Sequence, residues 1–180
     1  MMVLIEGCKN GDRESQRLLY KHYYSFALAI CIRYSQSMEE AKEILNDGFY
    51  KVFSKIELYD IDRSFEGWVK RIMINTAIDH YRANKKHYNH DDIIDHDKAV
   101  GENVMDDMSY EELLLLIQKL SPAYRTVFSL YVIDSYTHPK IAKKLGITVS
   151  TSKSNLMKAR ANLKKMLKVT NREVYEQYIR

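Results

Sequence analysis

The sequence contains little of what builds β-sheets, disulfide frameworks or membrane spans. Two prolines, six glycines and a scarcity of strand-like runs favour an all-helical chain. Cys8 and Cys31 lack a paired C-x-x-C spacing and indicate reduced thiols in a cytoplasmic protein. The longest apolar run, residues 26–32, is far below the ~20 residues that span a bilayer. The N-terminal stretch lacks the basic residues of a signal peptide.

Charge is distributed unevenly along the chain. Hydrophobic residues make up 46% of the 180 residues, enough for packed cores, and the net charge is only +4. Residues 63–86 hold six Lys or Arg against two acids, and residues 87–112 hold one Lys against nine acids. Residues 121–168 hold ten Lys or Arg against one acid. Two basic blocks around an acidic one predict two polyanion-binding surfaces and a spacer.

Helical periodicity predicts a first domain over residues 1–87. Apolar residues recur at helical spacing from residue 12 to about residue 34. They recur again over residues 41–56, behind a capping box formed by Ser37 and Glu40. A third long helix completes this domain.

Ser64 is placed to cap that third helix, which runs from Phe65 to Lys86. Residues 88–108 lose all periodicity and are rich in Asp, His and Asn, which predicts a flexible acidic linker. The second domain, residues 109–180, resumes with a helix. Ser121-Pro122 then caps the next helix, with proline at its first position.

Residues 137–163 have the pattern of a helix-turn-helix. Gly146 follows a short amphipathic helix and can adopt the left-handed conformation that turns the chain. Thr148 or Ser150 caps the second helix. Its predicted inner face comprises Val149, Ser152, Leu156, Ala159 and Leu163. Ser152 is a mild packing defect there, because an aliphatic side chain would fill the position better. The outward face offers hydroxyl, amide and ammonium groups suited to base edges and phosphates in a major groove.

The helix over residues 65–86 predicts a second nucleic-acid surface. Arg and Lys side chains share one stripe of its helical wheel, given ~3.6 residues per turn. Phe65, Trp68 and Tyr81 are expected to supply aromatic surface beside the stripe. Cations would hold phosphates and an aromatic ring would support an unstacked base. The alternative is that Phe65 and Trp68 belong to the core and that the charges form a solvated face.

Three blocks in order resemble the small two-domain sigma factors of bacterial RNA polymerase, of the extracytoplasmic-function (ECF) type. They are AKEILNDGFYKVF at residues 41–53, FEGWVKRIMINTAIDHYR at residues 65–82, and residues 120–160. The resemblance implies an all-α fold. A region 2 domain of three or four helices and a four-helix region 4 domain would be joined by the linker. It also implies a factor that binds core polymerase, directs it to promoters and helps melt the −10 element.

The resemblance implies roles for three groups of residues. Contacts with the coiled coil of the beta-prime subunit would be Glu43, Asn46, Asp47 and Phe49. The loop and wedge for an extruded base of the −10 element would be Asp62, Arg63, Ser64, Phe65 and Trp68. The contacts with the −10 strand would be Arg71, Asn75, Asp79 and Arg82. The basic stripe of the same helix adds Lys85 and Lys86 to these contacts. Contacts with the −35 duplex would be Lys140, Ser150, Thr151, Lys153, Ser154, Asn155, Lys158 and Arg160.

Three positions depart from the family pattern. Glu43 and Asn46 stand where many members have Asp and Gln, changes that keep the chemistry. Asn155 stands where many have Arg, which removes a cation and leaves the −35 preference open. The resemblance also implies an anti-sigma protein as a partner. It implies no cofactor, no metal, no small-molecule substrate, no catalytic activity and no insertion into a membrane.

Two rival hypotheses remain from the residues alone. A helix-turn-helix regulator that never joins polymerase would explain residues 121–168 but leaves the first domain without a role. An enzyme would need a metal held by the cluster His87, His90, Asp91, Asp92, Asp95, His96 and Asp97. That segment has no periodicity and no apolar shell to shape a site, which favours a solvated linker.

Overall fold

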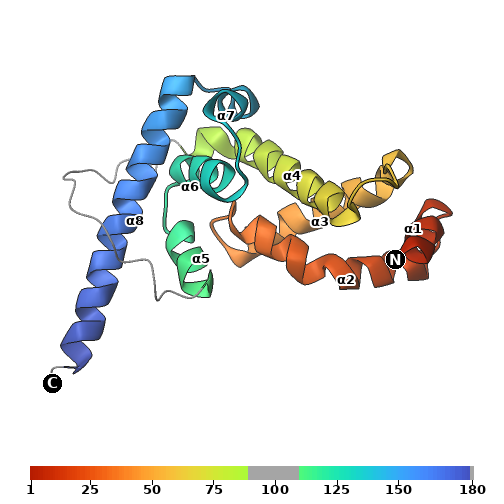
Figure 1. Cartoon of the computed structure of the whole chain (residues 1–180), viewed down its shortest axis with the longest axis horizontal. Coiled ribbons are helices and arrows are strands. Elements are labelled where there is room, and N and C mark those ends of the chain that lie inside the picture. Colours follow the sequence, from red (N-terminus) through yellow and green to blue (C-terminus); the bar gives the residue numbers. More distant parts are fainter. Residues whose placement is uncertain (89–109, 179–180) are drawn as a thin grey trace. The chain divides into compact units, whose positions relative to one another are not determined.

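The computed structural model describes residues 1–88 and 110–178, with side chains described for residues 1–85 and 113–167. Every regular element in these ranges is helical, which confirms the all-α prediction (Figure 1). The chain divides into two compact units, Met1–Ala83 and Asn84–Arg180, and each has its own buried core. Over the described ranges, no helix has the length and apolar content that a bilayer crossing requires.

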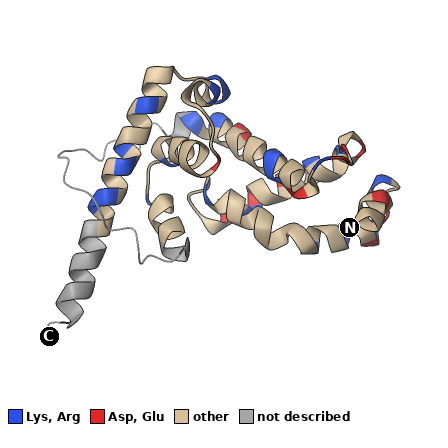
Figure 2. Ribbon diagram, in the orientation of Figure 1, with Lys and Arg blue, Asp and Glu red and all other residues tan. Residues whose placement is uncertain are grey.

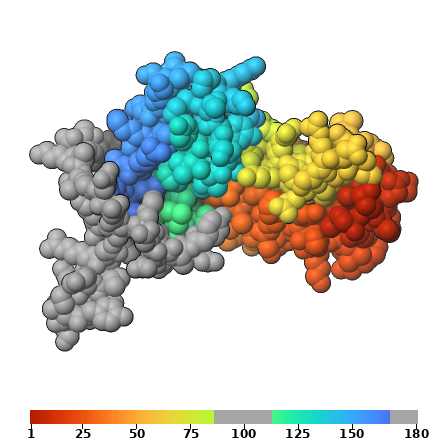
Figure 3. Space-filling view, viewed as in Figure 1, coloured from red at the N-terminus to blue at the C-terminus, as the bar shows by residue number. Residues whose placement is uncertain are grey.

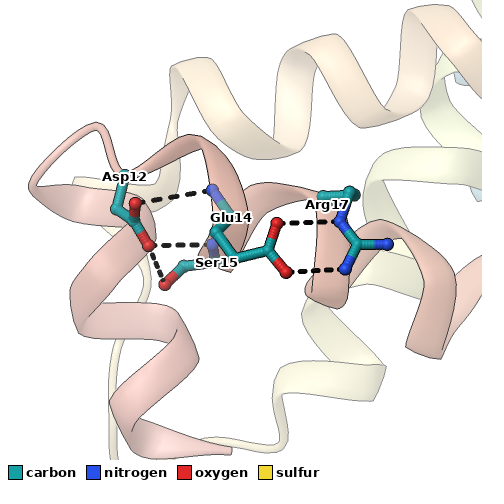
Figure 4. Close-up of polar contacts among 4 residues, drawn as sticks. All are labelled: Asp12, Glu14, Ser15 and Arg17. Atoms are coloured by element: carbon teal, nitrogen blue, oxygen red, sulfur yellow. Dashed lines mark hydrogen bonds and ion pairs between the residues drawn. The ribbon is translucent and has the colours of Figure 1, made fainter.

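The first unit opens with α1 (Met2–Lys9) and α2 (Arg13–Ile32). The Asp12 carboxylate caps α2, accepting hydrogen bonds from the amides of Glu14 and Ser15 at 3.4 and 2.9 Å (Figure 4). This cap fixes the start of the helix where the periodicity placed it. Figure 4 also shows the Arg17 guanidinium on the Glu14 carboxylate, one turn along α2.

The helix α1 was not expected from the sequence. It has no side-chain cap at its start, so no local signal marks it. Ile5 and Cys8 bury one face of the helix against the rest of the unit, so tertiary packing stabilises it. Cys8 and Cys31 are both buried free thiols, and burial raises the pKa of Cys31 to about 12.

The helix α3 (Met38–Ser54) begins with a variant of the predicted capping box. The Ser37 hydroxyl accepts from the Glu40 amide at 3.2 Å, as expected. The Glu40 carboxylate instead accepts from the amide of Gln36, one residue earlier than the usual pattern. A short 3-10 turn, η1 (Ile56–Leu58), follows α3.

The last helix of the unit, α4 (Phe65–Tyr88), starts where Ser64 was predicted to cap it. The Ser64 hydroxyl accepts from the Gly67 amide at 3.2 Å. The core combines buried aromatic rings with aliphatic side chains, of which Leu19, Val52 and Val69 are fully excluded from solvent. Figure 3 shows how side chains fill the space that the ribbons leave open.

We expect Gly48→Ala to destabilise the first unit. A methyl group at Gly48 would lie 2.2 Å from Sδ of Met73, whose side chain is completely buried. Repacking should lower the free energy of unfolding by about 1–3 kcal/mol, measured by urea denaturation. The matched control is Gly67→Ala, where the nearest atom is 3.6 Å away and the change should stay within about 0.5 kcal/mol. Equal stability of the two variants would contradict the prediction.

The second unit comprises α5 (Tyr110–Gln118), α6 (Pro122–Phe128), the π-helical turn η2 (Ser129–Ile133), α7 (His138–Leu145) and α8 (Val149–Tyr178). Pro122 stands at the first turn of α6, as predicted, but the Ser121 hydroxyl makes no capping hydrogen bond. Proline at this position has no amide that needs a partner, and its fixed φ of about −65° favours the start of a helix. The chain continues from α6 without a break and changes to π-helical geometry at Ser129.

Arg125 lies in the core of the second unit with 1% of its surface exposed. Its guanidinium Nη1 donates to the carbonyl oxygens of Gln118 and Leu120 at 2.9 and 3.5 Å. These carbonyls stand at the C-terminal end of α5, where the helix dipole places partial negative charge. A buried cation therefore joins the end of α5 to α6.

Candidate nucleic-acid interface

The helix-turn-helix is built as the sequence predicted. Gly146 caps α7 in the left-handed conformation, with φ 62° and ψ 44°. The Ile147 amide donates to the carbonyl of Ala142 at 3.1 Å and closes the turn. The Thr148 hydroxyl accepts from the Thr151 amide at 3.0 Å, so Thr148 is the cap of α8. Ser150 is therefore left on the exposed surface.

The inner face of α8 agrees with the prediction at every position except Val149. Leu156, Ala159 and Leu163 are buried as expected, whereas Val149 is 39% exposed. Ser152 is completely buried and bonds to Nδ1 of His138 at 2.9 Å. Ser152 is therefore a partner in a polar contact between α7 and α8 rather than a simple packing defect. The sequence interpretation missed this because His138 lies fourteen positions away.

His138 occupies a crowded position between the two helices. Its ring stacks on that of Tyr131, with centroids 4.4 Å apart. Partial burial lowers the pKa of His138, and the nearby charges of Lys153 and Arg160 lower it further. The imidazole is accordingly biased toward its neutral form, in which the Nδ1–Ser152 contact is made between uncharged groups.

The groups assigned to the −35 duplex lie on α8, except for Lys140, which lies on α7. Lysines and arginines recur along α8 in Figure 2. The exposed members of the set are Lys140, Ser150, Thr151, Lys153, Lys158 and Arg160. Ser154 and Asn155 are half-buried. The Lys158 ammonium lies over the ring of Tyr124 at 5.8 Å, which places that cation beside α6.

The helix α4 presents a basic face on the first unit. Arg71 and Arg82 are exposed, while Asn75 and Lys85 are half-buried; the side chain of Lys86 lies outside the described residues. Because Arg71 and Arg82 are eleven residues apart, they share a face about 16 Å apart along the axis. Asp79 is exposed between them and pairs with Lys51 of α3 at 3.1 Å.

The aromatic residues of α4 correct the expected aromatic surface. Phe65 and Tyr81 are only 5% and 7% exposed, so both belong to the core. The rings of Phe65 and Trp68 have centroids 5.5 Å apart, and Trp68 is half-buried. Phe65 therefore lies beneath the preceding loop and not at its surface. This agrees with the alternative hypothesis that Phe65 belongs to the core. Of the three rings, Trp68 offers the most accessible surface.

The loop before α4 contains the remaining −10 candidates. Asp62, Arg63 and Ser64 are all exposed. The Arg63 guanidinium Nε pairs with the carboxylate of Asp60 at 3.0 Å. Arg63 is thus held by a neighbour that the sequence interpretation did not single out.

The candidates for polymerase contact lie on α3. Glu43, Asn46 and Asp47 are exposed on one face, but Phe49 is 2% exposed and packs on Tyr20 with centroids 4.5 Å apart. A buried ring cannot be a direct contact, so Phe49 supports the face from within. Tyr50, which the sequence interpretation missed, is 74% exposed. Its place off the apolar stripe, one turn after Asn46 and Asp47, could have identified it.

The acidic linker and the metal-site hypothesis fall almost entirely outside the described residues. Of the linker, only Tyr88 lies in a described element, the end of α4. Of the seven His and Asp residues, only His87 does. Within the described part of the chain, no cluster of three or more metal-ligating side chains is present.

Comparisons with known proteins cover both units. Residues 19–87 match the family model described as Sigma-70 region 2, and residues 110–163 match Sigma-70, region 4. The chain is 28% identical over 177 residues to the ECF RNA polymerase sigma factor SigW of Bacillus subtilis, covering 91% of this chain and 95% of that one. It is 26% identical over 183 residues to the RNA polymerase sigma-H factor of Pseudomonas aeruginosa, covering 94% and 95%.

A solved structure has a similar fold. It is the sigma factor RpoE in complex with the anti-sigma factor NepR from Bartonella quintana, with a TM-score of 0.51 at 18% identity. The match covers 85% of this chain and 96% of that one. At this identity the likeness shows the fold alone.

Proposed function

This chain belongs to the sigma-70 family of RNA polymerase factors, and from that premise we propose how its two units divide promoter recognition. The chain is a transcription initiation factor that binds core RNA polymerase and directs it to specific promoters. The observation that carries the proposal is the presence of both sigma regions, in order, in one chain. A plain helix-turn-helix regulator would have no use for the first unit.

The second unit reads the −35 element as intact duplex. The first turns of α8 enter the major groove, where hydroxyl and amide groups meet base edges and the lysines meet phosphates. Support comes from the exposed side chains of Ser150, Thr151 and Lys153 and from the Thr148 cap, which fixes where the helix starts.

The first unit holds the opened strand of the −10 element. Arg71 and Arg82 on α4 bind phosphates of the strand that are not adjacent, since the two residues lie about 16 Å apart along the helix. The loop over residues 60–64 meets an unpaired base. Opening costs stacking energy of ~1.4 kcal/mol per base-pair step, and extruding a base costs a few kcal/mol more. One helix cannot supply that alone. Tethering to the duplex contact and to polymerase makes strand binding effectively intramolecular.

Polymerase binds the exposed face of α3. Glu43, Asn46, Asp47 and Tyr50 supply two carboxylates, one amide and an exposed aromatic ring on adjacent turns, and tyrosine is a residue type that interfaces favour. The beta-prime coiled coil is the proposed partner. Catalysis then belongs to polymerase, and this chain works in the cytoplasm without a cofactor, metal or small-molecule substrate of its own.

An anti-sigma protein is a further proposed partner. The solved relative is held in a complex with such a protein. We expect a protein of the same class to compete with polymerase for the α3 face of this chain.

Run-off transcription with core polymerase tests the proposed function. We expect the purified chain to direct initiation at discrete sites when genomic fragments serve as templates. A core enzyme without the chain provides the baseline. Failure to start RNA synthesis on every template, or failure to bind core polymerase at all, would favour the independent regulator instead.

We expect Lys153→Ala to weaken duplex binding equally on all sequences. The lost phosphate contact should reduce the slope of log K against log salt by about one unit, measured by fluorescence anisotropy with holoenzyme. Lys119→Ala removes an equal charge from an exposed position after α5 and should leave the slope unchanged. An unaltered slope for Lys153→Ala would remove this lysine from the interface.

A further inference from the structure

The loop between η1 and α4 is closed by its own side chains. The Tyr59 hydroxyl donates to the Arg63 carbonyl oxygen across the loop. The Asp60 carboxylate accepts from the Asp62 amide at 3.1 Å and from Arg63 Nε at 3.0 Å. The Asp60 carbonyl accepts from the Arg63 amide at 3.1 Å. Four bonds within five residues give this segment a defined shape.

The base of the loop is part of the core. Tyr59 is 8% exposed, and its ring meets Phe65 edge-on with centroids 4.9 Å apart. It also lies 5.5 Å from Trp68, between centroids, on the first turn of α4. Phe65 packs in turn on Tyr23 of α2, with centroids 5.4 Å apart. The tyrosine ring is therefore held by a cluster of rings from two helices, α2 and α4, and this fixes the position of its hydroxyl.

The tip of the loop contrasts with its base. Ile61 is 56% exposed, and Asp62 and Ser64 on its C-terminal side are exposed as well. The large aliphatic side chain of Ile61 is thus exposed at the tip of an ordered loop, beside polar groups. Such a tip combines apolar surface for the face of a base with acceptors for its edge.

We propose that Tyr59 and Asp60 are positioning residues for −10 strand recognition. They hold residues 60–64 in the shape that receives the unpaired base, with Ile61 against its face. This inference rests on the proposed function. Fixing a residue's backbone costs about 1–2 kcal/mol of conformational entropy. A loop ordered before binding avoids that loss when the base arrives, and the base that fits best gains most.

Selection from a fully randomised pool of single-stranded DNA tests the proposal. Holoenzyme captures the pool, and sequencing gives the enrichment of each base at the selected positions. Tyr59→Phe removes only the hydroxyl, and Asp60→Ala removes the carboxylate. We expect each substitution to reduce the enrichment of the preferred base roughly tenfold, which is the discrimination that one base contact provides. The total amount of captured DNA should change less than about twofold.

Two further variants separate positioning from folding and from charge. Glu57→Ala removes an equal charge from an exposed position on η1, outside the loop, and should keep the wild-type enrichment. Asp60→Asn can still accept from the Asp62 amide and should restore most of the enrichment that Asp60→Ala loses. Thermal unfolding should be unchanged in both Asp60 variants, because this side chain is half-exposed.

The outcomes distinguish this inference from the proposed function. Wild-type enrichment in Tyr59→Phe and Asp60→Ala would overturn the positioning role while the proposed function stands. A loss of enrichment matched by an equal loss of captured DNA and a lower melting temperature would also overturn it, since the residues would then act on folding alone. Capture of no DNA by wild-type holoenzyme would reject the proposed strand contact itself.

Discussion

Replacing Arg71 and Arg82 together with alanine is expected to abolish open-complex formation while leaving core polymerase binding nearly intact. Both guanidinium groups are exposed on one face of α4, whereas the proposed polymerase face lies on α3. Two charge-assisted contacts are lost, each worth about 1.5 kcal/mol, so the amount of open complex should decrease by roughly a hundredfold or more. Permanganate reactivity of unpaired thymines measures opening, and co-purification with core polymerase measures assembly.

The control keeps the same change of charge within the same unit. Arg13 and Arg17 are both exposed on α2, and Arg17 already pairs with Glu14 at 2.6 Å. Their double replacement should leave opening within about twofold of wild type, since exposed pairs contribute little. If the α4 variant lost polymerase binding and opening in equal measure, α4 would be a polymerase contact and not a strand contact.

Arg125→Ala is expected to unfold the second unit at moderate temperature. The substitution leaves the carbonyls of Gln118 and Leu120 without their buried donor and opens a cavity where the side chain was. Unpaired buried polar groups and a cavity together should lower the free energy of unfolding by about 3–5 kcal/mol. Circular dichroism of the full chain should show early loss of part of its helical signal.

The consequences should be confined to one half of the molecule. Because the two units have separate cores, the first unit should keep its melting transition and its binding to core polymerase. Recognition of the −35 duplex should disappear. Arg17→Ala replaces an exposed arginine and should change the free energy of unfolding of neither unit by more than about 0.5 kcal/mol. A stable Arg125→Ala chain would mean that water or neighbouring groups satisfy the carbonyls.

Local features of the fold could be read from the sequence because a few adjacent residues decide them. Asp12, Ser37 and Ser64 each cap the helix that the periodicity placed behind them. Gly146 adopts the left-handed turn that only a residue without a side chain tolerates easily. These choices depend on three or four neighbouring groups and on no distant partner.

Other features depend on partners far along the chain. Nothing in the first ten residues marks α1, and the Ser152–His138 contact joins two helices. The π-helical turn at Ser129 breaks a pattern that reads as a continuous helix. Burial of Ile5 and Cys8 stabilises α1, and the Ser152–His138 contact forms only where α7 packs on α8.

The sequence predicted which helices carry the candidate site better than it predicted which of their side chains are exposed. The outward faces of α4 and α8 carry the charges that the helical wheel assigned to them. Phe49, however, was assigned to a contact by resemblance, and Phe65 both by resemblance and as aromatic surface beside the basic stripe, although both rings are buried. Periodicity alone would have buried them correctly. Asp60, by contrast, could be identified only from the geometry of the folded loop.

The length of α8 limits where promoter preference can be altered. A helix of 30 residues extends about 45 Å, whereas the major groove is only ~12 Å wide. Bases can therefore be reached only from its first few turns. Further along, Leu163 and Leu167 are buried, so substitutions there act on stability. Libraries intended to change the promoter preference of this factor should vary the exposed positions between 150 and 158 and leave the later turns of α8 unchanged.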